Sequence, residues 1–236
     1  MDHAVLYLVL TSLFGLFMAW AIGANDVANA MATSIGSKAV TLKQALIIAA
    51  IFEFSGSVLA GGAVTSTIRK GIVDPHMFTG HPTLLIYGML AALLASGLWL
   101  LIASRFGWPV STTHSIVGAI VGFAAVGLGY DSVKWANTAV ILFGWVLSPI
   151  VGGILAYVIF TSVEKFILER KDPLAAARRY VPLYMFLAGF TISAVTLIEG
   201  LSHIGLHLSL TECYSLAVAV GIVIAAIGAL LIRNIQ

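Results

Sequence analysis

Two clusters of polar residues lie inside apolar stretches of this sequence, and their residue types could bind ions. The first cluster, AIGANDVANA, contains Asn25, Asp26 and Asn29 within the apolar stretch Ala4–Ile35. Glu53 has similar surroundings, near the middle of IIAAIFEFSGSVLA. An ionisable group inside a membrane costs about 2.5–3.5 kcal/mol on insertion scales, so it marks a functional site by default. The alternative is structural: a protonated carboxyl, or hydrogen bonds to a neighbouring helix.

The second cluster is GWPVSTTHS, which starts at Gly107. Gly107 and Pro109 are expected to end one helix, and Pro109 suits the start of the next. The first turn of that helix would then carry three hydroxyl groups, those of Ser111, Thr112 and Thr113. Unpaired backbone N–H groups and the positive end of the helix dipole make such a turn an anion site. The alternative is ordinary capping by Ser111 or Thr112.

The two clusters predict complementary chemistry. The first supplies carboxylate and amide oxygens for a small hard cation, and the second supplies donors for a tetrahedral oxyanion. Every Lys and Arg lies between the apolar stretches or at their ends, so none is expected beside a bound anion. By analogy with phosphate monoesters, free phosphate carries about −1.5 charges near neutral pH. Co-bound cations would therefore have to hold it, as in a cation-coupled symporter.

These residues must be positioned by membrane helices. Of the 236 residues, 60% are hydrophobic and only 9% are charged, and the mean hydropathy is +1.05. A soluble domain needs about 25% charged residues, so the solvent is a bilayer and the fold class is an all-α, polytopic membrane helix bundle. The net charge of +2 gives no indication of nucleic acid binding. Seven stretches are long enough to span: Ala4–Gly23, Gln44–Val64, Thr83–Ser104, Val110–Gly129, Trp135–Val163, Val181–Leu201 and Cys213–Ile232.

The first apolar stretch is longer than a membrane requires. Ala4–Ile35 would form a helix of about 48 Å, against a hydrocarbon core of about 30 Å. It is therefore expected to tilt, protrude or break, and Gly23 followed by Asn25 and Asp26 is a natural break. Secondary transporters build their sites at broken helices.

Charge distribution predicts the orientation of the chain. The connection Glu164–Tyr180 holds five basic residues and is expected to be cytoplasmic. Alternation of spans then places the N-terminus outside, with Lys38, Lys43 and Arg105 inside. Arg69 and Lys70 fall outside, against the rule. The single cysteine, Cys213, lies in an apolar run and is expected to be a packing residue.

With these motifs, the sequence resembles the inorganic phosphate transporter (PiT) family. The resemblance is carried by GANDVANAMATSIGSKAVT (Gly23–Thr41) and PVSTTHSIVGAIVGF (Pro109–Phe123), with further matches in IFEFSGSVLAGG (Ile51–Gly62) and TIRKGIVD (Thr67–Asp74). It implies sodium- or proton-driven phosphate uptake, with no cofactor besides the co-transported ion, in a fold of two inverted repeats that often forms a homodimer.

The same resemblance implies roles for individual residues. Phosphate-binding residues would be Asn25, Ser111, Thr112 and Thr113. Cation-coupling residues would be Asp26, Asn29 and Glu53, with Asp26 and Asn29 as possible sodium ligands. No catalytic residue is expected, and the chain is not expected to be an enzyme.

Only the first half of the family pattern is present. Residues 1–163 are expected to form a first-repeat transport core with both motifs, 164–180 a cytoplasmic connection, and 181–236 further transmembrane helices. The family's second copies of both motifs do not appear. A missing C-terminal half or partner subunit is therefore expected, and residues 1–236 are not expected to transport unaided. The chain would reside in the cell (inner) membrane.

Three alternatives stay open. Sulfate or another tetrahedral oxyanion has the same donor needs, although a carboxylate acceptor favours phosphate that keeps a proton. An intramembrane hydrolase could use Ser111, His114 and an acid, an arrangement that chance also supplies in helices. His114 is more simply a packing residue. The third alternative is a membrane subunit without transport activity.

Overall fold

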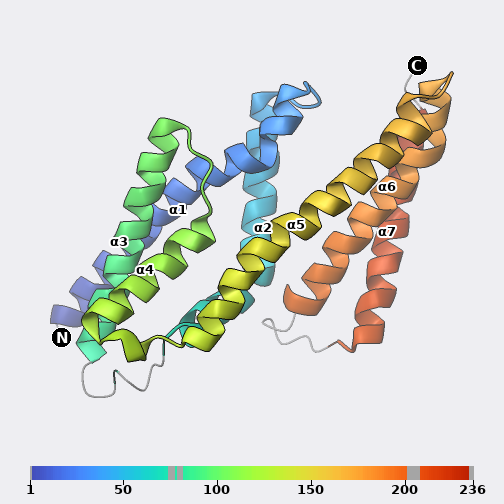
Figure 1. Ribbon diagram of the computed structural model, residues 1–236. Coiled ribbons are helices and arrows are strands. Elements are labelled where there is room, and N and C mark those ends of the chain that lie inside the picture. The colour runs from blue at the N-terminus through green and yellow to red at the C-terminus, as the bar shows by residue number, and fades with distance from the viewer. Residues whose placement is uncertain (1, 74–77, 79–81, 201–207, 234–236) are drawn as a thin grey trace. The chain divides into compact units, whose positions relative to one another are not determined.

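The computed structural model describes residues 2–73, 78, 82–200 and 208–233 of this chain, without the side chains of residues 2, 3, 60, 63–70 and 199. The fold is all-α, as predicted (Figure 1). Its α-helices are α1 (Asp2–Gly36), α2 (Leu42–Gly71), α3 (Pro82–Phe106), α4 (Thr112–Gly127), α5 (Trp135–Val163), α6 (Pro173–Val195) and α7 (Leu210–Arg233).

α1 is continuous, so the predicted break after Gly23 is wrong. The helix runs over 35 residues, a length of about 52 Å. A glycine costs a helix about 1 kcal/mol relative to alanine, which is too little to end it. The polar side chains of Asn25 and Asp26 find partners on other elements, described below, and leave the backbone ladder of α1 intact. Tilt or protrusion must therefore absorb the extra length.

Six helices, rather than seven, are long and apolar enough to cross a membrane among the described residues. The prediction of a full span over Val110–Gly129 is wrong, because α4 contains 16 residues and is about 24 Å long. A hydrocarbon core of about 30 Å exceeds that length. The extended segment and N-cap take Val110 and Ser111 from the predicted span, and Leu128 and Gly129 lie beyond the end of α4. α3 and α4 are thus a long helix followed by a short one.

The chain divides into two compact units, residues 1–55 with 65–140 and residues 56–64 with 141–236. In the first unit, α3 packs against both α1 and α4, and α4 runs back along α3 (Figure 1). Glycines allow this close packing. A Cβ on Gly97 would lie 2.7 Å from the ring of Phe17 in α1, and one on Gly88 would overlap the ring of Phe123 in α4.

The end of α2 is joined to the start of α5 within the same unit. The Lys134 N–H donates to Ile72 O at 2.9 Å, and Asn137 Nδ2 donates to Gly71 O at 3.2 Å. Val73 and Val133 form an isolated antiparallel bridge. At its other end, α2 starts with a capping box in which Thr41 and Gln44 bond each other's backbone N–H groups.

The second unit contains most of α5 together with α6 and α7. α6 and α7 pack closely, because Gly221 lies against Phe186 and Gly189 against Ile224. Cys213 is buried at 2% exposure, which confirms its packing role.

The boundaries of α6 differ from the prediction. The helix starts at Pro173 instead of Val181, because Asp172 caps it through the Ala175 N–H. A π-helical turn, η4, extends its end to Gly200, and the predicted end at Leu201 lies outside the described residues.

Candidate functional site

The site is built around the five-residue link between α3 and α4. α3 ends in a Schellman motif, in which Trp108 N–H donates to Ala103 O at 2.8 Å and Gly107 N–H to Ser104 O at 3.2 Å. Gly107 has φ +68°, a left-handed conformation that favours glycine. Pro109 follows and contributes no N–H. The chain therefore stops the helix sharply and enters an extended segment.

α4 starts with an N-cap, as one of the two readings of this motif predicted. Ser111 Oγ accepts the N–H of His114 at 3.3 Å, and Ser111 O accepts the N–H and hydroxyl of Ser115 at 3.2 and 2.9 Å. Within the described residues, the backbone N–H groups of Ser111, Thr112 and Thr113 have no hydrogen-bond partner. Capping thus satisfies one donor of the first turn and leaves three donors for a ligand.

Asn25 joins α1 to the link. Its side chain is 5% exposed and makes three contacts. Nδ2 donates to Trp108 O at 3.1 Å and to Ser104 Oγ at 3.3 Å, while Oδ1 accepts the Val110 N–H at 3.4 Å. The residue sits on a buried stripe of α1 with Ala21 and Met18, at the spacing of three and four residues that one helix face requires.

Asp26 lies on the next face of α1 and contacts the first turn of α4. The hydroxyl of Thr112 donates to its Oδ2 at 3.2 Å, and both side chains are half-buried. No described residue forms an ion pair with Asp26; Arg105, in the last turn of α3, is exposed. The carboxylate therefore stands beside the positive end of the α4 dipole with no positive side chain on it.

The structure brings together four of the sequence-predicted site residues, namely Asn25, Asp26, Ser111 and Thr112. Thr113 is exposed in the same turn, and Asn29 is exposed one helical turn along α1 from Asn25. Glu53 is exposed on α2, and no described hydrogen bond joins it to the other six. The partners Ser104, Trp108 and Val110 were not predicted, since nothing in their types distinguishes them from other residues of a membrane helix and its end.

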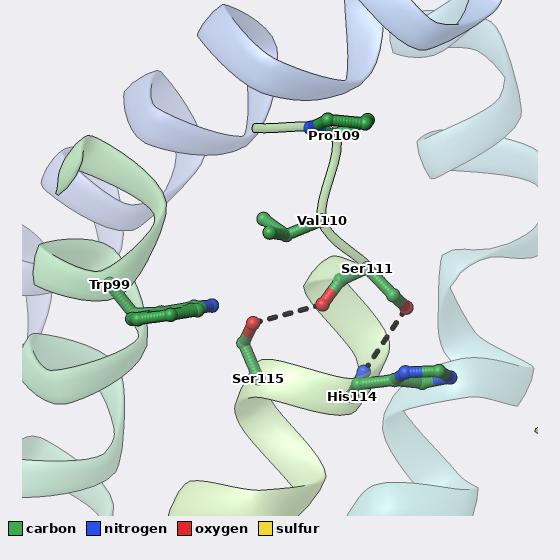
Figure 2. Close-up of a pocket in the computed structure, with 6 residues that line it drawn as sticks. All are labelled: Trp99, Pro109, Val110, Ser111, His114 and Ser115. Atoms are coloured by element: carbon green, nitrogen blue, oxygen red, sulfur yellow. Dashed lines mark hydrogen bonds between the residues drawn. The ribbon is translucent and has the colours of Figure 1, made fainter. Parts of the chain in front are cut away.

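An open hollow of about 420 Å³ adjoins the start of α4. Figure 2 shows Trp99 of α3 facing Ser111 and Ser115 across it, with Pro109, Val110 and His114 completing its lining. Asp26, Thr112 and Thr113 are not among the lining residues. The hollow thus reaches one side of the first turn of α4, and the carboxylate of Asp26 reaches another.

Among the described residues, six helices are long and apolar enough to cross a membrane, and they define a multi-pass integral membrane protein. Residues 22–226 match the model of the phosphate transporter family, and the chain belongs to that family. Its members are permeases rather than enzymes, which argues against the hydrolase alternative.

Individual relatives agree. The chain is 48% identical over 214 residues to the "Putative phosphate permease" of Haemophilus influenzae, covering 91% of this chain and 51% of that protein. It is 46% identical over 187 residues to "Inorganic phosphate transporter 2-1, chloroplastic" of Arabidopsis thaliana, covering 79% of this chain and 32% of that protein. A solved structure titled "The sodium-dependent phosphate transporter" matches with a TM-score of 0.88 and 37% identity, over 97% of this chain and 55% of that one. The chain therefore spans about half the length of these relatives, or less.

Proposed function

We propose that this chain forms part of a cation-coupled phosphate symporter and carries one of its ion-binding regions. Phosphate would be held by donors of the first turn of α4, from Ser111, Thr112 and Thr113. Asp26 and Asn29 would hold the coupling cation, sodium or proton, and Glu53 would contribute to coupling from α2. Homodimer formation, a location in the cell (inner) membrane and completion of the site by a C-terminal half or partner subunit belong to the same proposal.

The observation that carries this proposal is the contact between Thr112 and Asp26. The contact puts a carboxylate oxygen 3.2 Å from a hydroxyl of the turn that offers the free donors. An anion bound to those donors would lie close to a like charge. Two unit charges 4 Å apart repel by about 4 kcal/mol at an effective dielectric constant of 20. A cation or proton on Asp26 removes this repulsion, so binding of the two ions is coupled.

The test is uptake of labelled phosphate by the complete gene product in proteoliposomes, under separately imposed sodium and proton gradients. We expect one of the gradients to accelerate phosphate uptake. Excess unlabelled phosphate should abolish uptake of the label, and equal sulfate should not. Phosphate uptake at the same rate with neither gradient would contradict coupling, and equal competition by sulfate would contradict the choice of substrate.

A further inference from the structure

Both amide donors and the carbonyl of Asn25 bond to the end of α3 and to the link that follows it. A primary amide has two N–H donors and a carbonyl acceptor, and here both donors and the acceptor are occupied within 3.4 Å. Only one orientation of the amide satisfies these contacts, because the reverse would face oxygen toward the Trp108 carbonyl and nitrogen toward the Val110 N–H. At 5% exposure, the group has no open face for a ligand.

The link needs these contacts. Trp108 O and Val110 N–H bond to no described group other than Asn25, and Pro109 between them has no N–H. A backbone group in an apolar membrane environment must be paired. Asn25 pairs both at once, much as an adjacent β-strand would. It thereby fixes the direction in which the chain enters α4.

We infer that Asn25 is a positioning residue and does not bind phosphate itself. It holds the link so that the first turn of α4, with its free donors, meets Asp26. The claim that Asn25 serves phosphate binding rests on the proposed function. The claim that Asn25 holds the link rests on its contacts with Trp108 and Val110. It also separates the two asparagines of the first motif: Asn25 is buried against the link, whereas Asn29 is exposed and keeps its amide for an ion.

Amide hydrogen exchange, read residue by residue on the complete gene product in detergent, tests the inference directly. Without phosphate, the Val110 amide should exchange at least about tenfold more slowly than the amides of Ser111, Thr112 and Thr113. Asn25→Ala should remove that protection. Asn137→Ala is the matched control, because Asn137 also bonds a backbone carbonyl, Gly71 O, and should leave Val110 exchange at the wild-type rate.

Addition of sodium phosphate then separates positioning from ligation. We expect slower exchange at Ser111, Thr112 and Thr113, with Val110 unchanged. Faster exchange at Val110 would mean that Asn25 turns from the link to the ligand, and would overturn the inference. The inference would also be overturned if, in the wild-type protein, the Val110 amide exchanged as fast as the amides of Ser111, Thr112 and Thr113. This measurement does not depend on whether a variant folds. If phosphate slows none of these amides, the proposed phosphate site fails, while the role of Asn25 in the link is still decided by the phosphate-free measurements.

Discussion

Substitution of Asp26 by asparagine tests the electrostatic basis of coupling with little disturbance to the fold. The new side chain has the same shape, and its carbonyl oxygen can accept the Thr112 hydroxyl that now donates to Asp26 Oδ2 at 3.2 Å. The link contacts belong to Asn25 and are untouched. What disappears is the negative charge that would attract the coupling cation.

The expected effect is large. A cation about 4 Å from a carboxylate gains about 4 kcal/mol at an effective dielectric constant of 20. Because Asp26 is half-buried, solvent screens part of this attraction, and we expect a loss of about 2–4 kcal/mol. That corresponds to a cation affinity lower by about 30- to 1000-fold. If sodium drives phosphate uptake, its half-saturating concentration should rise accordingly. If protons drive it, the proton dependence should be lost, because an amide does not take up the proton that a carboxylate binds.

The assay is initial phosphate uptake by the complete gene product in proteoliposomes, as a function of the driving ion. Asp131→Asn is the control, because Asp131 is an exposed acid in the short turn Tyr130–Ser132 between α4 and α5. Phosphate uptake by the Asp131→Asn protein should depend on the driving ion as it does in the wild type. Asp26→Asn protein that is folded, as judged by its thermal midpoint in detergent, yet keeps the wild-type ion dependence would refute the cation role of Asp26.

Three further predictions concern the first turn of α4 and the packing beneath it. Thr113→Ala removes an exposed hydroxyl without a described partner. A hydrogen bond to a charged group is worth about 1.5–3 kcal/mol, so the phosphate KM should rise by about 10- to 150-fold with an unaltered thermal midpoint. A normal KM would exclude this hydroxyl as a ligand. Ser111→Ala removes the N-cap and should cost about 0.5–2 kcal/mol of stability, whereas Ser111→Gly should cost a few tenths; equal thermal midpoints for the two variants would contradict the capping role. Gly88→Ala puts a Cβ into the ring of Phe123, and the overpacking should lower the free energy of unfolding by about 1–3 kcal/mol. Gly122→Ala is the control: it lies in α4 with open space around it and should not lower the thermal midpoint.

The sequence was sufficient to predict helix ends and caps where nearby residues decide the backbone conformation. Gly107 and Pro109 predicted the break before α4, and the run of hydroxyls predicted its cap, because glycine, proline and serine act on backbone conformation within a few residues. The same local reasoning failed at Gly23. There the polar residues pointed to a broken helix, but their partners lie more than 75 residues away and satisfy them without any change in α1.

Span prediction failed for a related reason. Composition alone cannot show where a helix begins within an apolar run, and Val110–Gly129 is apolar enough to cross. The cap at Ser111 and a C-terminal stop at Gly127 shorten it to 16 residues. Likewise, the cap at Asp172 starts α6 inside a basic segment that was expected to be a loop. In both cases a single capping side chain decided a boundary that hydropathy left open.

Helix geometry explains why two neighbouring polar residues of one motif can serve different ends. Consecutive residues on a helix are rotated by about 100°, so Asn25 turns into the packed face of α1 while Asp26 turns toward its edge. A neutral amide is suited to the first position, because it offers donors and an acceptor to a backbone segment and carries no charge to desolvate. A carboxylate is suited to the second, because a half-exposed charge can still attract a mobile cation. In the proposed mechanism, the motif would thus couple a fixed contact with an exchangeable one. α1 holds the start of α4 through Asn25, and Asp26 would make the donors of that helix start usable by an anion only when a cation is present.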